Sequence, residues 1–352
     1  MLLVEATIND TLHRISAEGI ALDHYWDNRV ISFDPPQYQL ANLYGGYVRP
    51  GFGDIEFSHD LFADDWPPPV NMEITTYYTA TDEDAMERLF SGTGHIKRMT
   101  RDGIVYELFG PSYESIIVYN EHYQIGGMGG DTYMIGGMGS DEYRLGPGEA
   151  VSFDDTLVNV ATWFAHRFSL DIDTTYARSP SPDVIFSMTA DQIAINLLSD
   201  ICAFFTHLFY ISGGTLYLID MLADAGSETI TEFDFFPSEY EYNVPVAIAR
   251  TANYARPSSY YYGQDLSLGT EFVDTKEKVE AALDNIIAVL NKAGCALKMP
   301  FLGSVPTPGK KISWTDTSLG QDTDAYIRCR TIRYDFDNEE VIIEGEGELE
   351  AA

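Results

Sequence analysis

The middle of the chain contains the stretch Thr189-Ala-Asp-Gln-Ile-Ala-Ile-Asn-Leu-Leu-Ser-Asp-Ile-Cys-Ala-Phe-Phe-Thr-His-Leu-Phe-Tyr-Ile-Ser-Gly-Gly-Thr-Leu-Tyr-Leu-Ile219. Its first half carries apolar residues at helical spacing, namely Ile193, Leu197, Ile201 and Phe204 or Phe205. Thr189 is placed to cap this helix. Two adjacent glycines then separate two apolar runs, which is typical of a β-hairpin. The stretch therefore predicts a helix followed directly by a hairpin.

A second amphipathic helix is expected just before this stretch. Its apolar residues recur at i, i+3, i+4, i+7 and i+11: Leu157, Val160, Ala161, Phe164 and Phe168. Two helices and a hairpin within so few residues indicate a small α+β domain, which we place at residues 151–232.

Residues 1–115 are predicted to be rich in β-strands. Positions 2–8 alternate between apolar and polar residues, and Asn9-Asp10 suits a tight turn into residues 11–16. A further strand is expected at residues 73–79, and Gly103 suits the turn of a hairpin between residues 95–100 and 104–109. A short helix is predicted at residues 82–91, because Thr81 precedes three acidic residues and Gly92 is suited to end the helix.

Residues 233–352 are again expected to be mainly β, with one helix inserted at residues 274–293. Asp274 and Glu277 resemble a capping box, and Gly294 is expected to stop the helix. Its predicted buried stripe is Val279, Ala282, Leu283, Ile286, Ile287 and Leu290. A final hairpin is predicted from residues 326–336 and 341–345, with a turn at Asp337-Asn338.

Residues 116–150 contain a glycine-rich repeat with a period of ten. Gly-Gly-Met-Gly-Gly-Asp131 is followed by Gly-Gly-Met-Gly-Ser-Asp141, and each copy continues to a tyrosine. The pattern matches that of calcium β-rolls, in which Asp131 and Asp141 would be calcium ligands. The alternative is a duplicated loop or a finger of short strands, since the calcium repeat has period nine and needs more copies. Both interpretations predict an exposed contact loop.

The charge and cysteine content exclude several classes of function. The chain has 352 residues with 55 acidic and 21 basic side chains, so its formal net charge is −34. Such a negative net charge argues against binding to nucleic acids and against binding to an anionic membrane. The three cysteines are far apart, which favours reduced thiols. The N-terminus lacks the features of a signal peptide, and no apolar run is long enough to span a bilayer.

The sequence contains no familiar catalytic motif. Cys202 and His207 would point about 140° apart on a helix, so we interpret them as a buried cysteine and a histidine at the boundary of the core. The acidic doublets Asp64-Asp65 and Asp154-Asp155 suit helix starts or turns better than an acid–base pair, and Glu339-Glu340 forms no persuasive pair either. Residues 66–69, Trp-Pro-Pro-Pro, indicate a stiff connection, and Tyr260-Tyr261-Tyr262 indicates a half-exposed strand or an aromatic interface.

The order of these elements resembles the hub proteins of tailed-phage baseplates and tail tips. Three pieces look most similar. They are the stretch from Thr189 to Asp220, the segment from Ala281 through Met299-Pro300-Phe301 to Ile312, and the end from Tyr334 to Gly347. The glycine repeat has no counterpart in this pattern and looks like an insertion.

The resemblance implies a mainly β fold with α+β, made of two tail-tube-like β-barrel domains plus a small helix–helix–hairpin domain. It also implies a homotrimer that forms a ring around a DNA channel, with DNA only as passing cargo. The implied neighbours are tail-tube or distal-tail proteins, the tape measure, and tail fibre or spike proteins. The protein would then be a structural, non-enzymatic virion component made in the host cytoplasm, without an obligatory cofactor.

Two other functions stay open from the sequence. One is a calcium-dependent adhesion or glycan-binding module of a tail tip, based on Asp131, Asp141 and the tyrosine-rich segments. The other is a tail-associated cell-wall hydrolase, whose paired carboxylates a sequence alone does not reveal.

Overall fold

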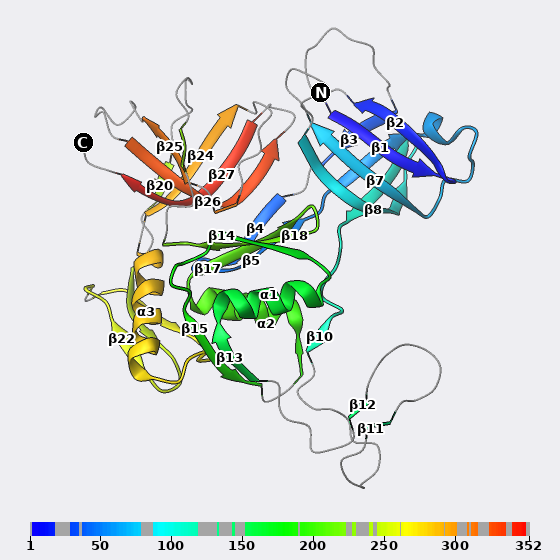
Figure 1. Cartoon of the computed structure of the whole chain (residues 1–352). Helices are drawn as coiled ribbons and strands as arrows, with labels where there is room; N and C mark the ends of the chain where they lie inside the picture. Colours follow the sequence, from blue (N-terminus) through cyan, green and yellow to red (C-terminus); the bar gives the residue numbers. More distant parts are fainter. Residues whose placement is uncertain are drawn as a thin grey trace.

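The computed structural model shows a mainly β protein with a layer of strands in its middle, helices on the lower side and two curled groups of strands above (Figure 1). One of these curled groups belongs to the same hydrogen-bonded sheet as the middle layer. The structure describes residues 2–17, 29–34, 37–78, 87–118, 132–133, 143–144, 152–188, 191–222, 227–229, 239–241, 245–260, 262–291, 293–300, 308–309, 311–315, 324–335 and 340–349. The predicted fold class is confirmed.

The N-terminal sheet has seven antiparallel strands and curls into a barrel. Its order is β2 (Thr11–Ala17), β1 (Leu2–Ile8), β7 (Asn71–Tyr78), β8 (Glu87–Met99), β9 (Gly103–Phe109), β6 (Asp54–Ser58) and β3 (Val30–Phe33). The two outer strands, β2 and β3, approach each other, so this N-terminal barrel leaves little open edge. A short 3-10 helix, η1 (His59–Phe62), follows β6.

The first hairpin follows from its sequence. Val4, Ala6 and Ile8 are fully buried, as the alternating pattern predicts. Asn9 and Asp10 both have positive φ, 48° and 64°, which is the backbone of a two-residue turn that matches the strand twist. The predicted hairpin around Gly103 is confirmed too, because Met99 pairs with Ile104.

The helix predicted at residues 82–91 is wrong where the structure describes it. Residues 87–91 belong to the long strand β8, which pairs with β7 on one side and β9 on the other. Residues 82–86 lie outside the described residues. Hydrogen bonding to two neighbouring strands outweighs the modest helix propensity of Glu87 and Leu89.

The central sheet has eleven strands drawn from all parts of the chain. Its main path is β14 (Asp171–Tyr176), β18 (Thr215–Asp220), β17 (His207–Ser212), β5 (Gly45–Gly51), β4 (Gln37–Asn42), β26 (Asp324–Asp335), β27 (Glu340–Leu349), β24 (Ala293–Pro300) and β20 (Glu239–Glu241). Off this path, β25 (Lys311–Thr315) pairs with β26 and with β19 (Ser227–Thr229). The predicted hairpins β17–β18 and β26–β27 are both present.

Two helices lie on the lower side of this sheet, and a third stands beside them (Figure 1). They are α1 (Leu157–Arg167), α2 (Ala194–Phe204) and α3 (Lys276–Leu290). The predicted apolar faces of α1 and α3 are buried, except that Leu290 is only partly buried. All three helices contribute to one hydrophobic cluster, so α3 packs against the same core as α1 and α2.

Three predicted helix boundaries need correction. The second helix starts at Ala194 instead of following Thr189, because Gln192 and Ile193 pair with the strand β10 (Ile117–Val118). The N-cap of α3 is Thr275, whose hydroxyl accepts a hydrogen bond from the Lys278 amide, and not Asp274. This helix ends at Leu290, and Gly294 lies in β24.

The hairpin β17–β18 has two apolar faces. Phe209, Leu216 and Leu218 belong to the cluster that contains the helices. Leu208, Tyr210 and Ile219 belong to a second cluster with Leu40 and Val48 on the opposite face. Because successive strand residues point to opposite faces, the hairpin is buried on both sides and contributes to both hydrophobic clusters.

Three small sheets and one short hairpin complete the described fold. β13 (Ser152–Thr156) pairs with β15 (Asp183–Ser187), and β10 pairs with β16 (Gln192–Ile193). β21 (Val246–Arg250) lies between β22 (Ala255–Pro257) and β23 (Gln264–Ser267). In the glycine repeat, β11 (Thr132–Tyr133) pairs with β12 (Tyr143–Arg144). Among the described helices, none has the length and hydropathy that crossing a membrane requires.

Candidate functional site

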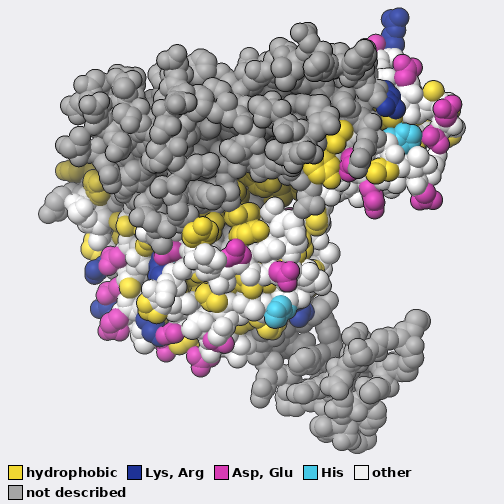
Figure 2. All heavy atoms as spheres, turned by 45° about the horizontal axis from the view of Figure 1, so that its top comes forward, with side chains coloured by type: hydrophobic (Ala, Val, Ile, Leu, Met, Phe, Trp, Pro, Cys, Tyr) yellow, Lys and Arg dark blue, Asp and Glu magenta, His cyan; other side chains and the backbone are white. Residues whose placement is uncertain are grey.

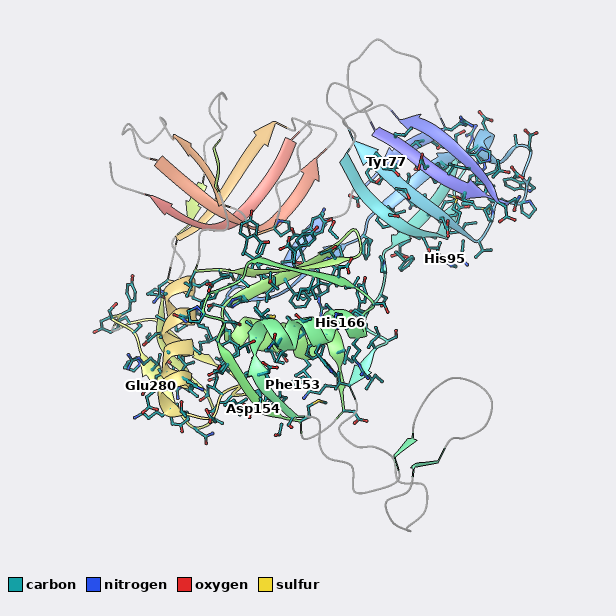
Figure 3. The ribbon with its side chains drawn as sticks, in the orientation of Figure 1. Tyr77, His95, Phe153, Asp154, His166 and Glu280 are labelled. Atoms are coloured by element: carbon teal, nitrogen blue, oxygen red, sulfur yellow. The ribbon has the colours of Figure 1, made fainter. Side chains whose placement is uncertain are left out.

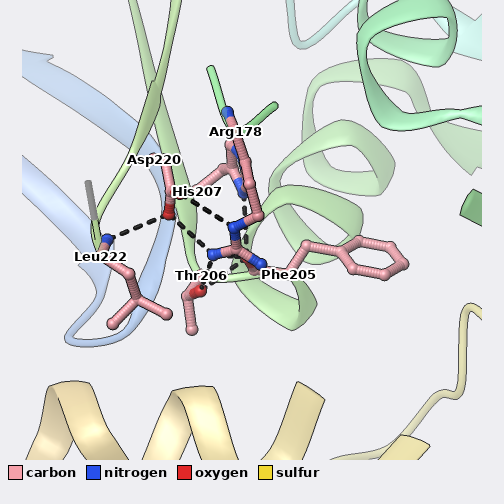
Figure 4. A network of polar contacts seen from close by, with 6 residues as sticks. All are labelled: Arg178, Phe205, Thr206, His207, Asp220 and Leu222. Carbon is pink, nitrogen blue, oxygen red and sulfur yellow. Dashed lines mark hydrogen bonds and ion pairs between the residues drawn. The ribbon is translucent and has the colours of Figure 1, made fainter. Parts of the chain in front are cut away.

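A buried polar network joins the α2–β17 connection to the end of β18 (Figure 4). The Arg178 guanidinium donates from Nε and Nη2 to the two carboxylate oxygens of Asp220, at 2.8 and 2.7 Å. Its Nη2 also donates to the Thr206 hydroxyl at 2.9 Å and to the Phe205 carbonyl at 3.3 Å. The Leu222 amide donates to Asp220 as well.

His207 belongs to this network and takes one neutral tautomer. Its Nε2 accepts a hydrogen bond from the Arg178 amide, so Nδ1 carries the proton and donates to the Phe205 carbonyl at 2.9 Å. Burial lowers the pKa of His207 to about 4, and burial raises the pKa of the Cys202 thiol. Cys202 is thus buried in α2 as predicted, whereas His207 is fully buried at the start of β17 and not at a boundary.

Asp64-Asp65 lies in the bend that follows η1, as predicted, and Asp154-Asp155 lies in β13 directly before α1. Asp155 accepts hydrogen bonds from the Thr156 amide and the Asn159 side chain at the start of α1, and these bonds lower its pKa. Asp65 accepts from the Asn9 side chain at 2.9 Å. Glu340 lies in β27, and Glu339 lies outside the described residues.

Apart from the network of Arg178, His207 and Asp220, the titratable side chains labelled in Figure 3 do not converge on one site. His95 lies on the N-terminal barrel, Asp154 and His166 lie near α1, and Glu280 lies on α3 (Figure 3). No group of three or more His, Cys, Asp or Glu residues suited to a metal ion occurs among the described residues. Asp131 and Asp141, the proposed calcium ligands, lie outside them. In the described parts of the repeat, Tyr133 pairs with Tyr143 across the short hairpin.

The aromatic and proline segments singled out from the sequence lie at the surface. Tyr260 and Tyr262 are exposed in the loop between β22 and β23, so the strand predicted there is wrong for these two residues. Residues 66–69 connect η1 to β7, as predicted, and the Pro69 carbonyl accepts a hydrogen bond from the buried Tyr106 hydroxyl at 2.8 Å.

An open cavity lies where the N-terminal barrel meets the central sheet. We call it the aromatic groove. Its volume is about 290 Å³, and its aromatic lining consists of Tyr38, Tyr47, Phe52, Phe90 and Tyr113. In Figure 2, hydrophobic side chains are concentrated in the middle of the view, whereas acidic and basic side chains lie mostly toward its outer parts.

The sequence analysis did not identify the aromatic groove. Its rings come from β4, β5, β8 and two loops, which are far apart in the sequence. The only local signal is the high density of tyrosine, proline and phenylalanine between residues 38 and 52.

The complete fold is similar to three solved structures of phage tail proteins. The 43 kDa tail protein of prophage MuSo2 from Shewanella oneidensis aligns with a TM-score of 0.53 and 10% identity, over 98% of this chain and 97% of that chain. The chain has the fold of phage tail proteins. A tail protein from Neisseria meningitidis aligns with a TM-score of 0.52 and 8% identity, over 98% of this chain and 96% of that one.

The third tail protein is a prophage protein from Listeria monocytogenes. It aligns with a TM-score of 0.50 and 8% identity, over 97% of this chain and 94% of that chain. The phage-tail resemblance seen in the sequence is thus confirmed for the fold, end to end. No protein-family model matches the sequence, and no curated protein matches it.

Proposed function

We propose that the protein is a structural component of a phage tail, located in the virion. The observation that carries this proposal is the similarity of fold to three phage tail proteins over 97–98% of this chain. Because both chains are covered almost completely, the similarity extends over the length of the chain and is not limited to one common motif.

The finer proposal is a hub or tip component of the baseplate that forms a homotrimeric ring around the DNA channel. Two curled sheets, the N-terminal barrel and the strands β24–β27, lie on the same side of the molecule (Figure 1). If each curled sheet takes the place of one tail-tube subunit, three copies would present six similar units to a sixfold tube. The domain boundaries at residues 115, 150 and 232 belong to this proposal.

The partners follow from such a position. They are tail-tube or distal-tail proteins on one side, the tape measure inside, and fibre or spike proteins on the other side. The net charge of −34 suits a conduit, because acidic walls repel the phosphates of passing DNA. The protein would act by assembly, without catalytic turnover or a resident cofactor.

Native mass spectrometry of the purified full-length chain tests the trimer. We expect a species of about three times the 39.3 kDa mass of the chain, and a ring with an axial hole by negative-stain electron microscopy. A compact monomer at micromolar concentration would contradict the hub role. A calorimetric titration with Ca²⁺ tests Asp131 and Asp141, since their ligand role predicts heat that the Asp131→Asn and Asp141→Asn variants lose.

A further inference from the structure

The aromatic groove has the composition of a ligand site. The N-terminal barrel contributes Phe90 and Ser91 of β8, and the central sheet contributes Tyr38, Tyr47 and the Ser212–Gly214 turn. A volume of about 290 Å³ lies at the lower end of small-molecule sites. The groove therefore offers room for a small ligand and not for a folded partner.

None of the described residues that line the groove carries a charge. This is notable in a chain in which 22% of residues are charged. Burial raises the pKa of both Tyr47 and Tyr113, so their hydroxyls stay protonated and neutral near pH 7. A charged ligand would lose water here without an ionic partner among the lining residues, and that desolvation is costly, although Arg49 and Glu114 act electrostatically on Tyr47 from nearby. The lining selects a neutral occupant.

The lining combines flat apolar rings with hydroxyl groups. Tyr38, Tyr47 and Tyr113 supply three phenol groups, and Ser91 and Ser212 supply two aliphatic hydroxyls. A purely apolar ligand would cover these hydroxyls and leave them without water. We propose that the aromatic groove binds a neutral carbohydrate, whose C–H faces stack on the rings while its hydroxyls pair with the tyrosine and serine hydroxyls.

Several of the rings are held in place by other aromatic rings. Tyr47 stacks on Phe209 with centroids 5.0 Å apart, and its amide donates to the Ser199 hydroxyl at 2.9 Å. Phe52 packs against Phe90 at 5.8 Å. Tyr113 packs against Phe168 at 5.3 Å. Because these contacts already restrict the rings, binding costs little additional conformational entropy.

The glycine at position 110 shapes one wall of the groove. A Cβ at Gly110 would come within 2.4 Å of the Phe52 ring, so the ring would have to move from its place at the groove wall. On the other side, a Cβ at Gly214 would meet nothing within 4 Å, which shows that the turn β17–β18 borders open space. The position of the Phe52 ring therefore depends on Gly110.

A glycan array probed with the full-length chain tests the inference. The array carries two groups of glycans, a neutral arm and an anionic arm. The affinity for a neutral glycan is then measured by calorimetry with cellotetraose, maltotetraose or chitotetraose. We expect binding in the neutral arm only. The Tyr38→Ala and Phe52→Ala variants should each weaken it about ten-fold or more, because each removes a stacking surface.

Tyr262→Ala is the matched control, since Tyr262 is 91% exposed and does not line the groove. It should bind as the wild type does. Circular dichroism and native mass on the same samples verify folding and assembly, so this test is independent of the proposed tail function. The inference is overturned by an empty neutral arm, by binding in the anionic arm only, or by full affinity in both groove variants. Binding of a proline-rich decapeptide in place of every glycan would overturn it too.

Discussion

Arg178 and Asp220 form a bidentate ion pair, with Nε 2.8 Å from Oδ2 and Nη2 2.7 Å from Oδ1. Asp220 ends β18, and Arg178 lies in the connection between β14 and β15. Burial alone would raise the pKa of Asp220, but hydrogen bonds from Arg178 and Leu222 and the nearby His207 hold it below its ordinary value. The pair therefore links two segments at the sheet end that faces the helices.

We expect Asp220→Asn to lower the free energy of unfolding by about 3 kcal/mol. The substitution keeps the size of the side chain but leaves the guanidinium without its opposite charge. Chemical denaturation at pH 7 measures the change. Asp265→Asn is the matched control, because the Arg250–Asp265 pair is exposed and such pairs contribute at most about 1 kcal/mol. Equal losses in the two variants would contradict the structural role of the Arg178 network.

His207 should make the fold sensitive to mild acid. Burial lowers its pKa to about 4. The positive charge of Arg178 also lowers this pKa, whereas Asp220 and the hydrogen bond to the Phe205 carbonyl act to raise it. In the unfolded chain the imidazole binds a proton near pH 6.5, so between pH 6.5 and 4 the unfolded state binds more protons. Stability from this group is therefore complete above pH 6.5 and falls by about 3 kcal/mol as the pH drops to 4.

The difference between the wild type and His207→Asn isolates this effect. The asparagine amide keeps a donor for the Phe205 carbonyl but does not titrate. Urea unfolding at several pH values should show the wild type losing about 3 kcal/mol more than the variant between pH 7 and 4. If the stability of the two proteins changed with pH in the same way, the pKa of His207 would not be lowered in the folded protein, and the prediction would be wrong.

Thr76→Val should stabilise the N-terminal barrel. The Thr76 side chain is fully buried, and its hydroxyl has no hydrogen-bond partner. Valine has nearly the same shape and removes the unpaired group, so we expect a gain of about 1 kcal/mol. Denaturant unfolding measures it. Thr75→Val serves as the comparison, since the Thr75 hydroxyl lies 3.3 Å from that of Ser91 and should give no gain.

Gly45→Ala should destabilise the protein by about 3 kcal/mol. Gly45 has a φ of 143°, and a Cβ there would lie 2.5 Å from the His207 carbonyl oxygen. A left-handed residue pressed against backbone has no easy relaxation. Gly269→Ala is the control, because its Cβ would meet nothing within 4 Å. A thermal melt of both variants should lower the midpoint for Gly45→Ala alone.

Local patterns were predicted well wherever the decisive interactions are local. The turn at Asn9-Asp10, the apolar face of α1 and the hairpin β17–β18 all follow from neighbours in the sequence. The helix predicted at residues 82–91 failed because β7 and β9, distant in sequence, offer hydrogen bonds to β8. The start of α2 moved for the same reason, since Ile193 pairs with Ile117.

The sequence by itself determined the mainly β character, the three amphipathic helices and most turns, because residue spacing and turn chemistry act over a few positions. Only the tertiary structure decided that α3 shares a core with α1 and α2, and that β4, β5 and β26 join the hairpin β17–β18 in one sheet. It also decided the aromatic groove, whose rings come from Tyr38 through Tyr113. Such arrangements depend on which apolar faces and strand edges meet, and that is a property of the whole folded chain.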